Sequence, residues 1–460
     1  MRSSWWCEHA WLGGDSDQNT VADRVLISLA DGRITAVDTG ADPLPSSHRL
    51  AGLVLPGLAN AHSHAFHRAL RARTQRDHGS FWTWRDLMYR AADALNPDRY
   101  RRLARAVYAE MALAGITAVG EFHYLHHDVG GARYSDPNAM GHKLIDAAAD
   151  AGIRMTLLDT CYLSAAPDGT PLAEGPQRRF GDGTGEQWAQ RVDALRAQVS
   201  DRPGVLIGAA LHSVRGVPIG DMPVVVEWAA AHQVPLHVHS SEQPAEIEQC
   251  LAAHGRTPTA VLRDVGALGP RSTAVHCTHL TAADIADLDR TSTGVCFCPT
   301  TERDLGDGIG PAAALLAGSG LFSLGSDSHA VIDLLEEARA VELDERLASG
   351  RRGNISAGRL LRAATADGQR ALGWADAGAL TIGSRADFVA VDVNSVRTAG
   401  AGATVENAVF AASAGDVTDV VIDGRAVVAD RRHLVVADVA AELASVIGEL
   451  LDTESASALR

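Results

Sequence analysis

Lysine is almost absent from this sequence. Lys143 is the only one, so nearly all of the 41 basic residues are arginines. We attribute this bias to genome composition, because the fold only weakly constrains the choice of surface charge. With 57 acidic residues the net charge is −16, which argues against nucleic acid or an anionic membrane surface as the main partner. A local arginine cluster can still bind a small anionic molecule.

Cysteines are few, and none of the six belongs to a CxxC pair. This excludes a disulfide-rich framework, and we expect buried thiols in a reducing compartment. No apolar run approaches the roughly 20 residues of a membrane-spanning helix. Residues 1–12 lack a basic stretch followed by a long apolar core, so we expect no signal peptide. These absences predict a soluble, cytoplasmic protein without a membrane partner.

Hairpin signals occur near both ends of the chain. Two Asp-Gly pairs, at 31–32 and 423–424, each stand between two short apolar stretches. Another short strand is expected between residues 383 and 393. Strands at both ends suggest one small β-sandwich domain built from the two termini, followed by a C-terminal helix. We therefore predict a division of the chain into residues 1–55, 56–378 and 379–460, with the middle part inserted into the β-domain.

The middle part alternates apolar, strand-like stretches with helix-like stretches, which is typical of a parallel α/β fold. Eight such units predict a (β/α)8 barrel of the TIM type. Two connections, 67–96 and 162–187, exceed the usual loop length and are candidate lids over a substrate. The expected barrel strands are Leu53–Asn60, Ile116–Phe122, Arg154–Thr160, Leu206–His212, Pro235–His239, Thr273–His276, Gly294–Cys298 and Leu321–Ser326.

Potential metal ligands stand at the ends of several expected strands, where the active sites of such barrels lie. His62 and His64 are two residues apart, so on a strand both imidazoles point to the same face and can bind one ion. One HxH pair is weak evidence in a chain with 19 histidines. It gains weight because further candidates follow at other strand ends: His237, His239, Glu242, His276 and Asp327.

Three neutral imidazoles and one carboxylate suit Zn²⁺ and leave room for a water, and Fe²⁺ is possible with the same ligands. The spacing does not decide between His237 and His239, since both point to the same face of a regular strand. Glu242 has a second interpretation as the favourable negative charge of a helix that begins near Pro244.

Four stretches, PGLANAHSH, LHVHSSEQ, VHCTH and GSDSH, resemble in this order the motifs of the amidohydrolase superfamily. The resemblance covers almost the whole chain. Within the superfamily, the formimidoylglutamate deiminase family is the most similar, on the stretches HSHAFHRAL, SFWTWRDLMYR, EFHYLHHD, QRRF, LHSVRGV and TERDLGDGIG. Such enzymes of histidine degradation convert N-formimino-L-glutamate to N-formyl-L-glutamate and ammonia.

The resemblance implies one divalent metal ion, held by His62, His64, His239 and Asp327. It selects His239 because the family ligand precedes the glutamate by three residues. It also implies catalytic roles for His276, Glu242 and Asp327. A bound Zn²⁺ would lower the pKa of a water to about 7 and so provide hydroxide. Asp327 and His276 would then handle the water proton, and Glu242 would pair with the cationic formimino group.

A glutamate-derived substrate carries two carboxylates, for which two arginines are expected. The resemblance gives this role to Arg85 and Arg215, and it makes Tyr124 and His212 further substrate contacts. Arg85 has a second interpretation, because its segment is amphipathic and an arginine there fits a solvated face. His67 stands where the family usually has glutamine, and it should face the head group of the substrate. The replacement either preserves the activity or shifts it to another N-substituted glutamate.

Other functions stay open at this point. A heterocycle deaminase acting on a compound such as guanine, cytosine or adenosine would use the same metal and the same acid and base groups. A deaminase of another N-substituted amino acid would do so too. A non-enzymatic barrel of this kind would typically have lost metal ligands, which this chain retains. The resemblance also implies a homodimer.

Overall fold

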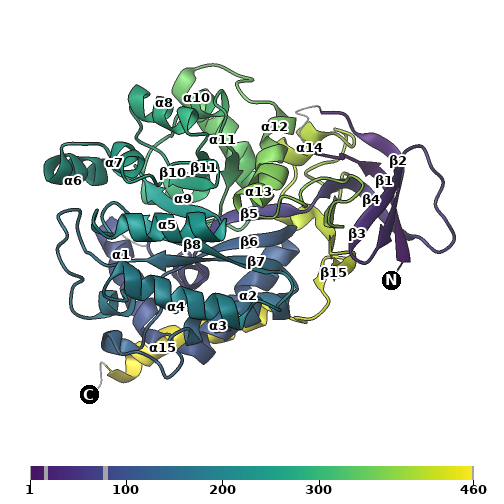
Figure 1. Cartoon of the computed structure of the whole chain (residues 1–460). Helices are drawn as coiled ribbons and strands as arrows, with labels where there is room; N and C mark the ends of the chain where they lie inside the picture. Colours follow the sequence, from purple (N-terminus) through teal and green to yellow (C-terminus); the bar gives the residue numbers. More distant parts are fainter. Residues whose placement is uncertain (1, 15–18, 76–80, 458–460) are drawn as a thin grey trace.

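The computed structural model describes residues 2–14, 19–75 and 81–457. It contains two sheets of eight strands each. In Figure 1, helices surround the barrel sheet, and strands β1 to β4 lie at one end of the molecule, away from α6 and α7. The prediction of a (β/α)8 barrel beside a small β-domain from both termini is confirmed.

The barrel sheet is parallel, and its strands follow one another in chain order. A bridge between Ser63 and Asp327 joins the first strand to the chain that follows the last one and so closes the barrel. The strands are β5 (Leu58–Ser63), β6 (Ile116–His123), β7 (Arg154–Cys161), β8 (Val205–Ser213), β9 (Leu236–Ser240), β10 (Ser272–His276), β11 (Gly294–Phe297) and β12 (Phe322–Leu324).

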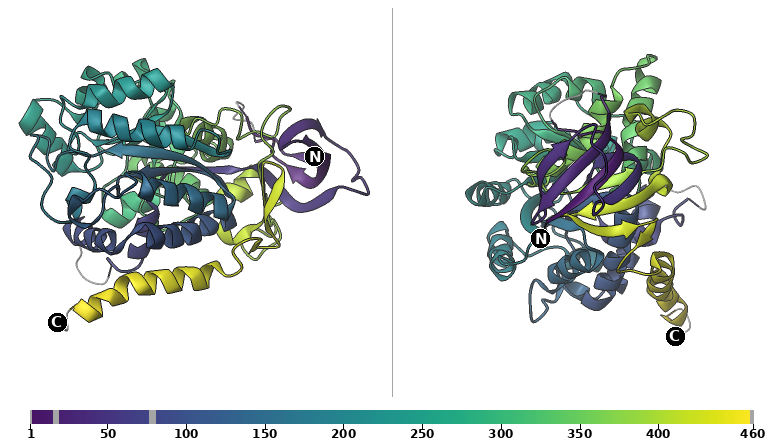
Figure 2. Two further views of the ribbon diagram at one scale, coloured as in Figure 1. Left: turned by 60° about the horizontal axis from the view of Figure 1, so that its bottom comes forward. Right: turned by 90° about the vertical axis from the view of Figure 1, so that its right-hand side faces the viewer.

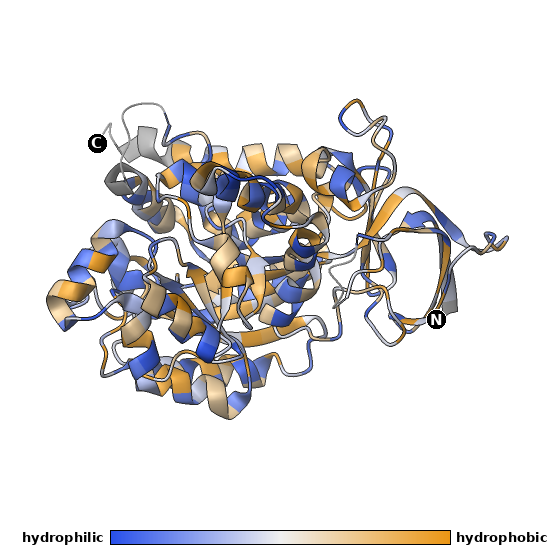
Figure 3. Ribbon diagram, turned by 90° about the horizontal axis from the view of Figure 1, so that it is seen from above, coloured by the Kyte–Doolittle hydropathy of each residue, from blue (hydrophilic) through white to orange (hydrophobic). Residues whose placement is uncertain are grey.

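The helices cover the outside of these strands. Figure 3 shows hydrophobic and hydrophilic residues mixed within single helices, as expected where one face packs on the strands and the other faces water. The main helices of the barrel are α2 (Pro97–Leu113), α3 (Ala139–Ala151), α4 (Gly185–Gln198), α5 (Met222–His232), α6 (Pro244–His254), α7 (Pro258–Asp264), α8 (Ala282–Arg290), α9 (Pro299–Leu305), α10 (Ala312–Leu316), α11 (Leu334–Ser349), α12 (Ala357–Arg362) and α13 (Gly368–Ala371).

The second sheet combines strands from both ends of the chain, which lie side by side in Figure 2. Strand β4 pairs with β1 from the N-terminal part and with β13 from the C-terminal part. In spatial order the strands are β16 (Arg432–His433), β15 (Arg425–Ala429), β14 (Val417–Ile422), β13 (Phe388–Val391), β4 (His48–Pro56), β1 (Arg2–Ala10), β2 (Ala22–Ala30) and β3 (Arg33–Asp38).

One expected strand, Leu53–Asn60, is wrong. Its first half belongs to β4 in the second sheet, and its second half begins β5 of the barrel. Gly57 lies between them and is packed so tightly that a Cβ atom there would be 2.5 Å from the Thr117 side chain. The chain therefore leaves one sheet and enters the other across Pro56-Gly57. The finer division at residues 55/56 and 378/379 stays a prediction.

The two long connections differ from each other. The segment 67–96 was expected to be a loop, but it contains helix α1 (Phe81–Ala94), whose residues Ala91 and Ala92 are buried in the core. The segment 162–187 is largely irregular up to α4. Buried Arg179 anchors it by donating to the carbonyl oxygens of His127 and Leu95, at 2.9 and 2.8 Å. This arginine therefore has a structural role in the loop.

The C-terminal helix, α15 (Val439–Ser457), runs along the outside of the barrel (Figure 2). Its residues Glu442 and Glu449 form ion pairs with Arg105 and Arg102 of α2. The C-terminal helix that the sequence predicts is therefore present and packs on α2.

Candidate active site

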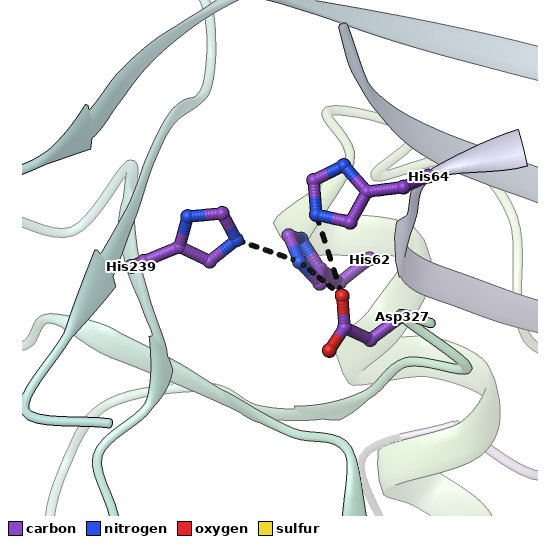
Figure 4. A group of neighbouring side chains, drawn as sticks. All are labelled: His62, His64, His239 and Asp327. Carbon is purple, nitrogen blue, oxygen red and sulfur yellow. Dashed lines mark hydrogen bonds and ion pairs between the residues drawn. The ribbon is translucent and has the colours of Figure 1, made fainter. Parts of the chain in front are cut away.

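The four predicted metal ligands come together at the carboxyl ends of the barrel strands (Figure 4). One ligand atom from each side chain lies within 4.8 Å of the ligand atoms of the others. The Nε2 atoms of His62 and His239 are 3.0 Å apart. Asp327 Oδ1 lies 3.2 Å from His62 Nε2 and 3.3 Å from His64 Nε2. All four side chains are buried.

Backbone carbonyl groups fix the orientation of two of these imidazoles. His64 Nδ1 donates to the Phe122 carbonyl oxygen at 3.0 Å, and His239 Nδ1 donates to the His212 carbonyl oxygen at 2.9 Å. With the proton on Nδ1, the Nε2 lone pair of each ring points into the group. This is how metal-binding histidines are commonly held.

These residues fit a divalent cation. Bonds of about 2.0–2.1 Å in a tetrahedral site place neighbouring ligand atoms about 3.3 Å apart, close to the three distances above. Burial lowers the pKa of His62, and it lowers those of His64 and His239 well below the usual value. The imidazoles are thus neutral, the form that binds metal. Burial would raise the pKa of Asp327, but the neighbouring histidines keep it below its usual range.

His276 and Glu242 lie beside this group. His276 Nε2 is 3.9 Å from both Glu242 Oε1 and Asp327 Oδ2, and its Nδ1 is 3.4 Å from Glu302 Oε1. Burial alone would lower the pKa of His276, but the three carboxylates raise it well above its usual value. His276 and Asp327 both have positive φ angles, 71° and 40°. Such backbone conformations in non-glycine residues are concentrated at functional sites.

The other histidines near the site have protein partners. His237 Nε2 donates to the Ala371 carbonyl oxygen at 3.0 Å, away from the ligand group. His279 Nε2 lies 2.7 Å from the Asp307 carbonyl oxygen. His329 is held between Ser63 and Ser326, at 3.2 and 2.9 Å. Of the two histidines that the spacing left open, His239 lies in the group of four and His237 does not.

One pocket brings the predicted residues together. Its lining contains every predicted site residue except His62, which is completely buried behind it. The predicted residues in the lining are His64, His67, Arg85, Tyr124, His212, Arg215, His239, Glu242, His276 and Asp327.

The wall of the pocket contains aromatic rings and the arginines Arg85 and Arg215. Tyr124 Oη lies 2.9 Å from His67 Nε2, and the His212 ring stacks on Tyr162 with centroids 3.8 Å apart. Burial lowers the pKa of His67 to about 3, so its ring is neutral. Arg215 lines the pocket and forms no ion pair with the other described residues, although Glu246 and Glu242 are near enough to act on its charge. Arg215 is therefore available to an anionic ligand.

A second histidine and aspartate group, His123, His126 and Asp159, also has atoms within 4.8 Å of one another. Asp159 already binds the Arg191 guanidinium through both carboxylate oxygens, at 2.7 and 2.8 Å, and accepts a hydrogen bond from Trp188. The arginine supplies the positive charge that a metal would bring. We interpret this group as a structural ion pair.

Several pocket residues escaped the sequence reasoning. Tyr89 and Tyr162 line the pocket, but aromatic residues are just as common in a core. Glu302 approaches His276 from the first turn of α9, and Glu246 accepts a hydrogen bond from the Glu242 backbone N–H at 2.8 Å. Both are acidic residues in first helical turns, where a negative charge is favoured without any functional reason. Nothing in the sequence separates these roles.

The fold and the ligand group together define a metal-dependent hydrolase. The amidohydrolase family profile matches residues 53–427, and the chain belongs to this family. The formimidoylglutamate deiminase of Pseudomonas aeruginosa is 39% identical to the chain, with 92% of the chain and 95% of the relative covered.

Other relatives have different names. The chain is 29% identical to a 5-methylthioadenosine/S-adenosylhomocysteine deaminase of Syntrophobacter fumaroxidans, with 90% of each chain covered. A crystal structure of an amidohydrolase from Brucella melitensis superposes with a TM-score of 0.89 at 31% identity, over 98% of this chain and all of that one. Among the described residues, no helix has the length and apolar character needed to cross a membrane.

Proposed function

We propose that the chain hydrolyses N-formimino-L-glutamate to N-formyl-L-glutamate and ammonia. One observation carries the proposal: a single pocket joins the His62, His64, His239 and Asp327 group to the arginines Arg85 and Arg215. The formimino group of this substrate is a cationic amidine and suits the carboxylates of the pocket. Its two carboxylates suit the arginines. The similarity to the Pseudomonas aeruginosa deiminase supports the same substrate.

We further propose that His62, His64, His239 and Asp327 hold one divalent metal ion, with Zn²⁺ preferred and Fe²⁺ possible. When bound, such an ion acts as a Lewis acid and lowers the pKa of a water to about 7.

Three side chains act as general acids and bases or polarise the substrate. Asp327 Oδ2 lies 3.9 Å from His276 Nε2. Asp327 accepts the proton of the attacking water, and His276, which three carboxylates keep protonated, polarises the formimino group. Glu242 pairs with the formimino nitrogen and delivers the proton that lets it leave. Water adds to the formimino carbon, the bond from this carbon to the terminal nitrogen breaks, and ammonia departs. The carbon keeps the water oxygen and becomes the formyl group.

The glutamate part of the substrate lies toward Arg85 and Arg215, which bind its two carboxylates. Tyr124, His212 and His67 complete the pocket around the substrate. His67 presents a neutral ring where the resemblance predicts glutamine, and either side chain can donate or accept one hydrogen bond. We therefore expect His67 to preserve the deiminase activity.

The test is a direct assay. The purified protein is analysed for bound metal, and ammonia release is measured with N-formimino-L-glutamate, N-formimino-L-aspartate, guanine and cytosine. We expect turnover of the first compound and its loss after removal of the metal. Turnover of a heterocycle without turnover of N-formimino-L-glutamate would favour the deaminase activities named for the more distant relatives.

The homodimer, which the resemblance implies, and the cytoplasmic location, which the sequence predicts, stay predictions. Light scattering of the purified protein measures the first.

A further inference from the structure

A second cavity lies directly outside the active-site pocket. Its volume is about 540 Å³, and its walls are helix α6 and the segment 165–168 after β7. The two cavities share three lining residues, Arg85, Ala165 and Arg215, whereas the metal-ligand group lines only the inner one. The arginines therefore stand where the inner pocket opens into the outer cavity.

Helix α6 presents small side chains to this cavity. Ala245, Gln249, Ala252 and Ala253 line it with the spacing i, i+4, i+7 and i+8, which places them on one side of the helix. Ala252 and Ala253 are exposed, and no large side chain of α6 fills the space. The cavity is thus roomy enough for several non-hydrogen atoms beyond the arginines.

The polar groups of the cavity suit a ligand with amide groups. Glu246 is buried in its wall; one of its carboxylate oxygens accepts the Glu242 N–H, and the other has no hydrogen-bond partner among the described residues. Arg215, which also lines the cavity, is a cation that acts on this carboxylate. The Gln249 side-chain amide and the Gln243 side-chain carbonyl group add hydrogen-bonding groups, whereas Gln243 Nε2 already donates to Asp307.

The direction of the substrate follows from the proposed function, on which this inference rests. The formimino group and the distal carboxylate are at opposite ends of N-formimino-L-glutamate. With the formimino group at the metal ligands, the distal carboxylate points toward Arg85 and Arg215. A group attached to that carboxylate would extend into the outer cavity.

We propose that the enzyme also hydrolyses N-formimino-γ-glutamyl dipeptides, in which a second amino acid is joined through the distal carboxylate. Such a compound keeps two negative charges, because the added amino acid brings its own carboxylate. Arg85 and Arg215 line both cavities and can reach a carboxylate on either side. The chemistry at the formimino carbon is unchanged: water adds, the bond to the terminal nitrogen breaks, and ammonia leaves.

The first experiment compares two substrates with the metal-loaded wild-type enzyme. Ammonia release is measured with N-formimino-L-glutamate and with N-formimino-γ-L-glutamylglycine. We expect the kcat/KM of the dipeptide to stay within about tenfold of the shorter compound. A larger loss overturns the cavity proposal alone, whereas no turnover of the shorter compound overturns the proposed function itself.

The second experiment fills the cavity. Ala252→Phe places a ring in the outer cavity, and Leu251→Phe is the matched control on the same helix, at a position 45% exposed and outside the cavity lining. Ala252→Phe should lower kcat/KM for the dipeptide by at least about tenfold and change that for N-formimino-L-glutamate by less than about twofold. Leu251→Phe should change neither. An equal loss for both substrates in Ala252→Phe would mean that the cavity is only an entrance, and would overturn the proposal.

Discussion

The Nε2 atoms of His62 and His239 lie 3.0 Å apart, although 177 residues separate them in the chain. His239 has its proton on Nδ1, because that atom donates to the His212 carbonyl oxygen. Its Nε2 lone pair therefore faces His62 and Asp327 inside a buried group. A cation at this point would accept lone pairs from all of these residues at once, which is the electrostatic reason for their convergence.

Replacing His239, a proposed metal ligand, should remove the metal, and His237 on the same strand supplies a control. We expect His239→Ala to weaken metal binding by more than the roughly 10–100-fold that loss of an outer hydrogen-bond partner costs. His237→Ala should keep the metal and lose about 1–3 kcal/mol of stability, because the Ala371 carbonyl group loses its donor. Metal content and urea unfolding of both variants check this. Equal metal loss in the two variants would contradict the assignment of His239.

Arg215 should control substrate binding without affecting the metal. Arg215→Ala removes charge-assisted hydrogen bonds worth about 1.5–3 kcal/mol, so kcat/KM for N-formimino-L-glutamate should fall about 10- to 100-fold, mainly through KM. Arg178→Ala is the control, because Arg178 is exposed and pairs with Glu174 in the same region of loops. Steady-state kinetics with metal analysis decide the matter. An unchanged KM in Arg215→Ala would exclude its role in binding a carboxylate.

Glu246 should act through Glu242 as a positioning residue. It holds the Glu242 backbone N–H at 2.8 Å, so Glu246→Ala should lower kcat by about tenfold with little change in KM, the effect of one lost hydrogen bond. Glu246→Gln retains a carbonyl oxygen and should restore most of kcat. A general loss of stability would instead reduce the amount of active enzyme in both variants, which active-site titration reveals.

The ion pairs of Arg191 should make the barrel acid-sensitive. Burial would raise the pKa values of Asp159 and Asp182, but the Arg191 guanidinium, 2.7 and 2.9 Å away, keeps both below their usual range. A lowered pKa in the folded state means stability that is present above the unfolded pKa of about 3.9 and lost as the pH falls through the folded value. Asp182→Asn should therefore lower Tm at pH 7, and the difference from wild type should shrink below about pH 4.

The same network predicts a large effect of removing the arginine. Arg191→Met leaves two buried carboxylates without their counter-ion and should cost about 3–5 kcal/mol of stability at pH 7. Denaturant unfolding measures this, and a cost below about 1 kcal/mol would contradict the structural interpretation of the group.

The sequence predicted the barrel well, since alternating elements and polar strand ends leave few other folds. Its failure at Leu53–Asn60 has a physical cause. Both halves of that stretch are apolar because both are buried, and only the pairing of β4 with β1 and β13 and of β5 with β6 shows that they belong to different sheets. Helix α1 was missed because its amphipathic stretch lies inside a connection that was treated as one long loop.

The candidate site was predictable only where residues of a metal-binding type follow an expected barrel strand. His62, His64 and Asp327 meet this condition. His237 and His239 share a strand face in the sequence pattern, and only the hydrogen bond of His237 to the Ala371 carbonyl group distinguishes them. The contacts of Glu246 with Glu242 depend on the position of a helix relative to a strand end, which no local pattern contains.

The closing seam of the barrel has a consequence for how the enzyme forms. The seam is made by the ligand-bearing segments themselves: Asp327 N–H donates to the His62 carbonyl oxygen at 3.0 Å, and His64 N–H donates to the Asp327 carbonyl oxygen at 3.2 Å. Asn60 and Ser326, 266 residues apart, bond to each other beside it. Contacts of such long range form late in folding. A nascent chain therefore has no complete metal site until its eighth barrel strand has been synthesised and has docked onto the first.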